Sequence, residues 1–181
     1  MKISKTFIND LLIIEPQLYK DDRGFFYESY NKKKLNKNIN NVFVQDNESK
    51  SKKGVIRGLH FQSPPYEQTK LVRCVSGKIL DVVVDLRTNS KTYGKSFSIE
   101  LSSKNNKQLF VPKGFAHGFQ VLSEEAIVNY KVDNFYNPKY DSGIIWNDKD
   151  LSIDWHLDIK PILSAQDLKL MPLKNLKSPF K

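Results

Sequence analysis

The sequence predicts an all-β protein, built as a β-sandwich or a jelly-roll β-barrel. Three observations support this fold class. Short stretches of two-residue alternation recur along the chain, turn residues separate them at short intervals, and long helical periodicity is rare. Because strands and helices do not alternate, the pattern argues against a parallel α/β sheet and favours sheets packed against each other.

The clearest strand is predicted at residues 79–86, where Leu80, Val82 and Val84 alternate with Asp81 and Asp85. One face of this strand is apolar and the other is mixed, as expected where the second face lines a cavity. Residues 96–101 alternate more simply, with apolar side chains toward a core and Ser and Glu toward water. Further strands are predicted at residues 24–30, 42–47, 69–75, 108–111, 118–122 and 127–131.

Turns and a few short helices complete the predicted elements. Turns are expected at Ser76-Gly77, Lys113-Gly114 and Asn137-Pro138. Helical segments are expected at residues 31–37 and after Ser164, near the C-terminus. No repeat, linker or low-complexity tract divides the chain, and 39% of its residues are apolar. We therefore expect residues 1–181 to form a single domain.

The charge balance is basic, with 29 Lys and Arg against 20 Asp and Glu. The lysines are scattered rather than gathered in one segment, which suits either an anionic ligand such as a nucleotide diphosphate or an ordinary solvated basic surface. Nucleic-acid binding is not expected, because no recognition motif accompanies the dispersed charge. The lone Cys74 favours a reducing compartment. With neither a signal peptide nor a membrane span in the sequence, a cytoplasmic protein is expected.

The chemistry must come from few groups, since the chain has only three histidines, His60, His117 and His156. Phosphate-binding loops, dinucleotide-binding glycine motifs and the Gly-x-Ser-x-Gly elbow are absent from the sequence. His60 and His117 could join a carboxylate in a metal site. Position 62, however, holds the amide Gln62 where a ligand would be needed, so no metal is expected.

The glycine-punctuated run at residues 54–62 places His60 in a strand-like segment, and Lys70 and Tyr130 occupy later strands. A histidine of pKa ~6.5 and a tyrosine of pKa ~10 can take and give a proton at neutral pH. A fixed ammonium can stabilise the enolate formed beside a ketone. Together these groups describe an epimerase. The alternative is structural: a core histidine, a rim cation and an interior tyrosine with a paired hydroxyl.

Over nearly its whole length the chain resembles the dTDP-4-dehydrorhamnose 3,5-epimerase family, cofactor-free nucleotide-sugar epimerases with a cupin-type jelly roll. The matching runs occur in family order and spacing, at residues 22–28, 45–49, 54–62, 68–74, 112–119, 130–131 and 163–167.

The resemblance implies a role for each of four catalytic residues. His60 would be the base that removes protons from C5 and C3, Tyr130 the acid on the opposite face, and Lys70 the cation at the enolate oxygen. Asp167 would hold the imidazole in the right tautomer. Residues 164–167 also fit a helix capping box, and one carboxylate is not expected to serve both purposes.

The resemblance also implies a set of substrate contacts. These are arginines for the diphosphate, aromatic side chains for the nucleobase and polar groups for the base, sugar or phosphate: Arg23, Arg57, Phe25, Tyr136, Glu28, Gln45, Asn47 and His117. Two positions depart from the family pattern, Asp141 for a frequent glutamate and Gln166 for a frequent lysine. Both lie near the nucleotide or the catalytic aspartate.

Arg57 and His60 are an odd number of residues apart, so a regular strand would point them to opposite faces. Either Gly58 marks a bulge or Arg57 serves a neighbouring subunit. The second option agrees with the family, whose dimers exchange N-terminal strands to complete each other's pockets, and a homodimer is expected. The alternative for Arg23 and Glu28 is an exposed ion pair at a turn.

The sequence therefore predicts an isomerase that inverts C3 and C5 of a dTDP-linked 4-keto-6-deoxy sugar. It would yield the precursor of dTDP-L-rhamnose. Four alternatives stay open: a single-centre epimerase, an enzyme for GDP-linked 4-keto sugars or heptoses, a metal-dependent cupin oxygenase or isomerase, and a non-catalytic nucleotide-sugar-binding module.

Overall fold

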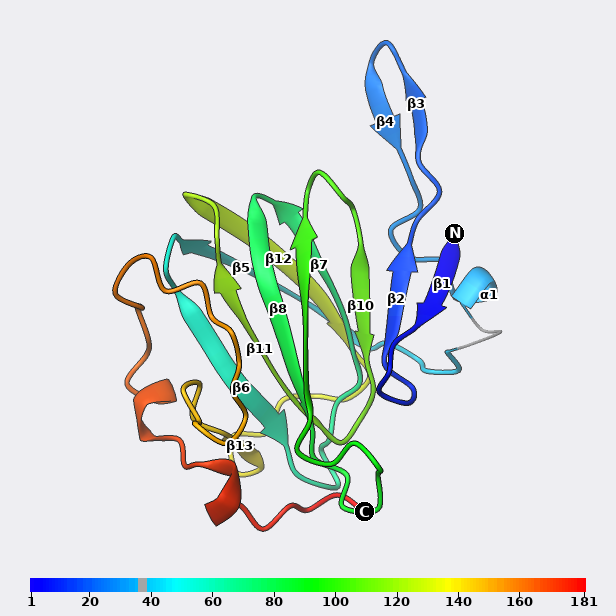
Figure 1. The fold of residues 1–181 in the computed structure, drawn as a ribbon. Helices are drawn as coiled ribbons and strands as arrows, with labels where there is room; N and C mark the ends of the chain where they lie inside the picture. The colour runs from blue at the N-terminus through cyan, green and yellow to red at the C-terminus, as the bar shows by residue number, and fades with distance from the viewer. Residues whose placement is uncertain (36–38) are drawn as a thin grey trace.

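A computed structural model describes residues 1–35 and 39–181. It confirms the predicted all-β class. Two antiparallel sheets face each other, and a separate two-stranded hairpin stands away from them (Figure 1). Within the described residues, no helix is both long and apolar enough to cross a membrane.

The strands follow the order of a jelly roll, with distant parts of the chain paired side by side. The six-stranded sheet contains, in order, β1 (Lys2–Lys5), β2 (Leu12–Glu15), β10 (Gln108–Val111), β7 (Lys70–Ser76), β12 (Glu125–Val132) and β5 (Gln45–Lys52). The five-stranded sheet contains β13 (Asp141–Gly143), β6 (Ile56–Gln62), β11 (Phe115–Val121), β8 (Lys78–Asp85) and β9 (Ser96–Ser102).

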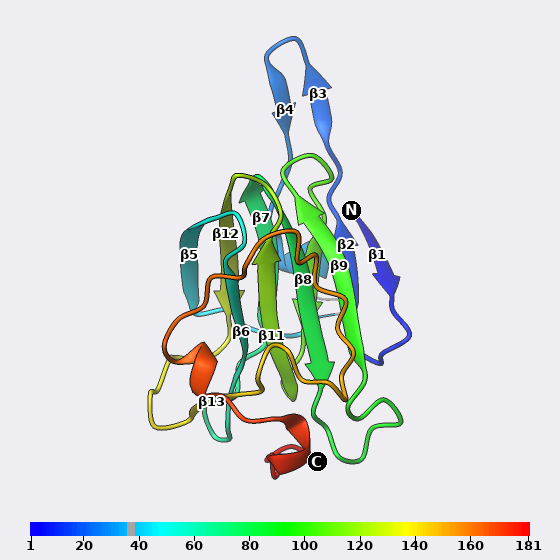
Figure 2. The same ribbon diagram turned by 60° about the vertical axis from the view of Figure 1, so that its left-hand side comes forward.

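The main core lies between the two sheets, and β8 shows how the sequence builds it. Its Ile79 and Val83 belong to this interior cluster, whereas Leu80, Val82 and Val84 belong to a second cluster on the outer face. The C-terminal segment crosses that outer face (Figure 2) and covers it with Leu151, Trp155 and Phe180 among other residues. Both faces of β8 are therefore buried, and its mixed face points to the interior as predicted.

One predicted strand is displaced. The sequence suggested residues 42–47, but β5 spans Gln45–Lys52 and pairs with β12 along its whole length. Val42 and Val44, which suggested the strand, are exposed. The inner face of β5 is polar because it borders a cavity, so the usual apolar alternation is missing and the prediction was wrong at both ends.

Other boundaries also differ from the predictions. The strand expected at residues 24–30 ends at Phe26, and the one expected from Gly118 begins three residues earlier, directly after Gly114. The helix expected at residues 31–37 is the single turn α1 (Lys32–Leu35), while residues 36–37 lie outside the described residues. The helix expected after Ser164 is two 3₁₀ turns, η1 (Asp167–Lys169) and η2 (Leu173–Asn175). Pro172 lies between them and cannot continue a helix.

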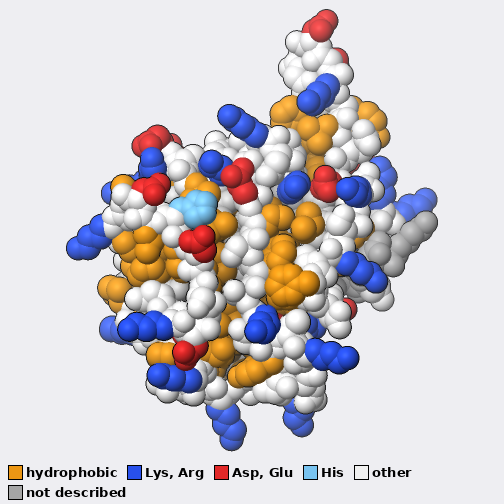
Figure 3. Space-filling model, viewed as in Figure 1, with side chains coloured by type: hydrophobic (Ala, Val, Ile, Leu, Met, Phe, Trp, Pro, Cys, Tyr) orange, Lys and Arg blue, Asp and Glu red, His pale blue; other side chains and the backbone are white. Residues whose placement is uncertain are grey.

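The hairpin formed by β3 (Tyr19–Asp21) and β4 (Gly24–Phe26) projects from the body of the molecule (Figures 1 and 2). Its aromatic side chains Tyr19, Phe25 and Phe26 are exposed. Elsewhere on the face drawn in Figure 3, basic side chains are dispersed rather than gathered into one patch, in line with the sequence.

Candidate active site

A cavity of about 480 Å³ opens between the two sheets. One wall carries Arg57 and His60 on β6 and His117 on β11, and the facing wall carries Lys70 on β7 and Tyr130 on β12. The C-terminal segment closes one side with residues 162–164, 166 and 167. The two sheets and the C-terminal segment thus bring six of the predicted site residues together: Arg57, His60, Lys70, His117, Tyr130 and Asp167.

A bulge in β6 places Arg57 and His60 on the same wall. His117 pairs with His60 and Phe119 pairs with Arg57, so two steps along β11 face three steps along β6. Gly58, at φ +110°, occupies the bulge, and a Cβ there would lie 2.7 Å from the Cα of Gly118. Only glycine fits this conformation and this close approach. Of the two options for Arg57, the structure therefore shows the bulge.

His60 faces a buried carboxylate. Its Nε2 lies 2.8 Å from Oδ1 of Asp167, whose side chain is 3% exposed. The two atoms are at ion-pair distance, and Nε2 has no hydrogen bond of good geometry to any described residue. A carboxylate in this position holds the imidazole in place.

Asp167 has a second set of contacts, on its other oxygen. Oδ2 accepts hydrogen bonds from the hydroxyl of Ser164 at 2.6 Å and from its backbone N–H at 3.1 Å. The backbone N–H of Asp167 in turn donates to the Ser164 hydroxyl at 3.1 Å. This is a complete capping box, so the expectation that one carboxylate could not serve both purposes was wrong. Each purpose uses a different oxygen.

These contacts set the charge of Asp167. Burial alone would raise the pKa of this carboxyl, but the imidazole of His60 and the groups of Ser164 stabilise the ionised form and lower the pKa to about 2. Asp167 is therefore an anion across the physiological pH range, available to a protonated His60.

Lys70 and Tyr130 are neighbours on the wall that faces His60. Burial lowers the pKa of Lys70 to about 8, with the negative charges of Asp141 and Asp81 opposing the shift. Burial raises the pKa of Tyr130, and the positive charge of Arg57 partly offsets it. At neutral pH the wall therefore presents an ammonium beside a protonated phenol.

His117 has a carboxylate partner that the sequence analysis did not select. Its Nε2 lies 3.0 Å from both oxygens of Asp81, which is 0% exposed. The sequence contained a signal for this pair. Asp81 is a charged residue within the apolar strand predicted at residues 79–86, and a buried charge requires an oppositely charged or hydrogen-bonding partner. The two histidines that line the cavity, on the adjacent strands β6 and β11, thus each face an aspartate.

The two departures from the family pattern touch each other at the rim of the cavity. Gln166 Nε2 donates to Asp141 Oδ2 at 2.8 Å, and the Tyr136 hydroxyl donates to the same oxygen at 3.1 Å. Gln166 also lines the cavity. Tyr136 and Asp141 are thereby linked to the segment that carries Asp167.

Gln62 anchors the loop that bears Tyr136. Its amide donates to the carbonyls of Tyr66 at 2.8 Å and Phe135 at 3.1 Å, and its oxygen accepts from the N–H of Asn137 at 2.6 Å. The residues on both sides of Tyr136 are therefore held by one buried side chain. The sequence analysis considered Gln62 only as a missing metal ligand.

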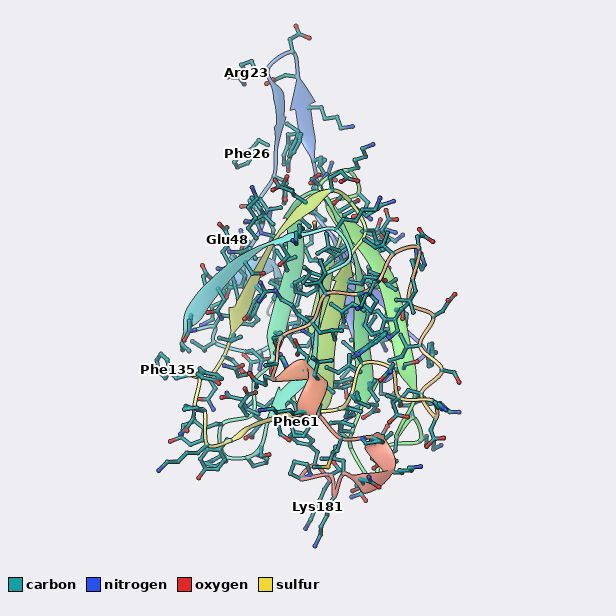
Figure 4. The ribbon with its side chains drawn as sticks, turned by 90° about the vertical axis from the view of Figure 1, so that its left-hand side faces the viewer. Arg23, Phe26, Glu48, Phe61, Phe135 and Lys181 are labelled. Carbon is teal, nitrogen blue, oxygen red and sulfur yellow. The ribbon has the colours of Figure 1, made fainter. Side chains whose placement is uncertain are left out.

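The remaining predicted contacts are not among the residues that line the cavity of their own chain. Arg23 is at the tip of the projecting hairpin (Figure 4), where it pairs with Asp21 at 2.6 Å. Phe25 is exposed on the same hairpin, and Glu28 accepts from Asn31 at 2.9 Å and pairs with Lys34. Gln45 and Asn47 lie on the inner face of β5 and bond each other at 2.7 Å.

The described residues contain no cluster of three or more His, Cys, Asp and Glu side chains arranged to hold a metal ion. His60 and His117 are cross-strand neighbours, but each faces its own aspartate.

Comparison with known proteins identifies the family. The family model described as dTDP-4-dehydrorhamnose 3,5-epimerase matches residues 5–175. The chain belongs to this family. Among the dTDP-4-dehydrorhamnose 3,5-epimerases, that of Shigella flexneri is 51% identical over 170 residues, which cover 93% of each chain. That of Methanothermobacter thermautotrophicus is 50% identical over 173 residues, or 94% and 93% of the two chains. The resemblance found in the motifs is thus confirmed, and the chain is an isomerase of this epimerase family.

Solved structures agree with this assignment and with the cupin-type jelly roll. The dTDP-4-dehydrorhamnose 3,5-epimerase of Elizabethkingia anophelis superposes with a TM-score of 0.93 at 50% identity, covering 98% of both chains. The Legionella pneumophila epimerase in complex with dTDP-4-keto-L-rhamnose gives 0.94 at 45% identity, covering 97% of this chain and 94% of that one. ChmJ, a 3'-monoepimerase from Streptomyces bikiniensis, gives 0.89 at 29% identity, covering 93% and 86%.

Proposed function

We propose that the protein inverts C3 and C5 of dTDP-4-dehydro-6-deoxy-D-glucose, giving dTDP-4-dehydro-L-rhamnose, without a cofactor. One observation carries this proposal. His60 and Tyr130 stand on opposite walls of one cavity, with Lys70 beside Tyr130. A sugar ring between the sheets would meet a base on one face and an acid on the other, which is the arrangement that inversion requires.

The proposed reaction runs through an enolate. His60 removes the proton from C5, and the electron pair of the broken C–H bond moves to the C4 oxygen, where the ammonium of Lys70 stabilises the negative charge. Tyr130 then delivers a proton to the opposite face of C5 and the C4 carbonyl re-forms. Asp167 stabilises the imidazolium meanwhile, and proton exchange with solvent restores both groups. The same sequence of steps at C3 completes the product.

Proton NMR of the purified protein in deuterated water with dTDP-4-keto-6-deoxyglucose tests this function. Deuterium entry at both carbons together with the L-lyxo product is the expected result. Exchange at one carbon alone would instead mark a single-centre epimerase, as ChmJ is described. No exchange with either this sugar or a GDP-linked 4-keto sugar would overturn the proposal in favour of a binding module. Retention of activity after exhaustive chelation separates it from a metal-dependent enzyme.

The ionisation of Lys70 predicts the alkaline side of the pH profile. Its ammonium is the form that stabilises an enolate, and its pKa is about 8 because of burial. We therefore expect the rate to be highest below this pH and to fall as the pH rises through it. Initial rates of inversion across this range check the prediction, and a flat profile through pH 8 would contradict it.

Deprotonation of Lys70 can be distinguished from deprotonation of Tyr130 and from unfolding as the cause of this fall in rate. Burial raises the pKa of Tyr130 above its usual value, so loss of its proton lies at higher pH. A loss of activity caused by unfolding is also not expected from Lys70, because its effect on stability has the opposite dependence on pH. An unfolded lysine keeps its proton to about pH 10.4, so the unfolded state binds more protons above pH 8 and the contribution of Lys70 to stability rises with pH there. In Lys70→Arg the guanidinium stays charged, and the step near pH 8 should vanish from the remaining activity.

We further propose that the whole chain acts as one domain within a homodimer, in the cytoplasm. The projecting hairpin supports the dimer, because it exposes three aromatic side chains and holds Arg23 far from the cavity of its own chain. Exposed aromatic residues that cluster on a projection favour burial against a partner. In the dimer, Arg23, Phe25 and Glu28 would complete the nucleotide end of the partner's cavity. The lone, buried Cys74 supports a reducing location.

Complementation tests the shared cavity. Arg23→Ala and His60→Ala should each be inactive alone, whereas co-expression should restore about a quarter of wild-type activity. Half of the randomly formed dimers are mixed, and each mixed dimer has one cavity with both residues intact. Sedimentation analysis checks that the variants remain dimers. Failure of the mixed, dimeric protein to regain activity would show that Arg23 serves its own chain.

A further inference from the structure

The inner face of β5 carries four consecutive polar side chains. These residues alternate in sequence with the charged residues of the outer face, and they are Gln45, Asn47, Ser49 and Ser51. The register places Asn47 opposite Tyr130 and Ser49 opposite Val128, which belongs to the interior cluster. Ser49 therefore points between the sheets, and it lines the cavity that holds His60 and Lys70.

Three of these four polar side chains have partners within the protein. Gln45 donates to Asn47 at 2.7 Å, and Ser51 accepts a hydrogen bond from Arg57 Nε at 3.1 Å. Ser49 differs, because its buried Oγ has no hydrogen-bond partner among the described residues. Across all the described residues, only two other buried side-chain atoms lack a hydrogen-bond partner, and one of them is Nε2 of His60 in the same cavity.

An unpaired buried hydroxyl is unfavourable, so a buried hydroxyl in a folded protein is expected to have a hydrogen-bond partner, either in the protein or in a ligand. Its neighbours indicate which part of a ligand is near. Along β5, Ser49 lies between Asn47, which faces the proposed acid Tyr130, and Ser51, which holds Arg57. A substrate that spans from Tyr130 to Arg57 must pass this hydroxyl.

We propose that Ser49 is a substrate-binding residue that donates a hydrogen bond to an oxygen of the glycosyl diphosphate, in the stretch that joins the reacting ring to the phosphates. This inference rests on the proposed function. The oxygen belongs either to the sugar or to the phosphate attached to it, and both accept from a hydroxyl in the same way.

Two variants test the role. Ser49→Ala removes the hydroxyl, and Ser49→Cys keeps a side chain of similar size with only a weak donor. We expect both to lower kcat/KM about tenfold, the loss typical of one hydrogen bond. Neither should lower the thermal midpoint, since no described residue loses a partner. Ser98→Ala is the matched control, because Ser98 is an exposed strand serine on β9.

The affinity for dTDP, which lacks the sugar, distinguishes the two oxygens. Weaker dTDP binding by Ser49→Ala supports a phosphate contact, and unchanged dTDP binding with reduced kcat/KM supports a sugar contact. A kcat/KM within twofold of wild type would overturn the proposal, as would a midpoint lowered by several degrees in both variants, which would reveal a structural partner. The wild-type protein, assayed alongside the variants, tests the proposed function separately. If the wild type itself shows no epimerase activity, the proposed function is wrong; if only the comparison of variants fails, the role of Ser49 is wrong.

Discussion

Replacement of His60 by alanine is expected to abolish deuterium entry at both C3 and C5. If one imidazole removes both protons, no other group on its wall takes over, because His117 is held by Asp81 at 3.0 Å. A general base contributes about 10²–10⁴-fold, so the rate should fall by about a thousandfold or more. The measurement is proton NMR in deuterated water, which follows exchange at each carbon independently of product formation.

The control for this variant is His156→Ala, which removes an exposed histidine and should leave exchange at the wild-type rate. The thermal midpoint of His60→Ala should change little, since Asp167 keeps its bonds from Ser164 and from the N–H of Gly58. Wild-type exchange at either carbon in folded His60→Ala would show that another group removes that proton.

Replacement of Tyr130 by phenylalanine should separate the two halves of the reaction. Proton removal by His60 is retained, so deuterium should still enter from the face that His60 occupies. Inversion needs a proton on the other face and should fall by about a hundredfold. Comparing exchange with inversion in one NMR experiment gives the ratio directly.

Phenylalanine keeps the packing of the Tyr130 ring against the interior cluster, so the thermal midpoint should stay near that of wild type. Tyr93→Phe, in the loop between β8 and β9, is a control for loss of a hydroxyl outside the cavity. An inversion rate equal to wild type in Tyr130→Phe would remove Tyr130 from the role of acid.

Local patterns predicted the strands that bury at least one apolar face. Residues 79–86 alternate and residues 109–111 are continuously apolar, and the structure places β8 and β10 there. The same reasoning failed at β5, whose inner face borders a cavity and is polar throughout. Periodicity reports the contrast between core and solvent, and a strand that lines a wet cavity lacks that contrast.

The site residues show a similar division. Residue type selected His60, Lys70 and Tyr130, the family resemblance added Asp167, and the cavity contains all four. Sequence reasoning did not select Asp81 or Ser49, whose importance depends on what lies opposite them. It also could not decide where Arg57 points, because one extra residue in a bulge reverses the face of everything beyond it.

By itself, the sequence determined the all-β class, the family and the residue types available for proton transfer, since each of these depends on local order along the chain. Only the tertiary structure decided which groups face each other. His60 and Tyr130 come from opposite sheets, one oxygen of Asp167 faces Ser164 and the other faces His60, and Arg23 is carried away from its own cavity. These relations join residues far apart in sequence, so they depend on strand pairing and register, which no local pattern contains.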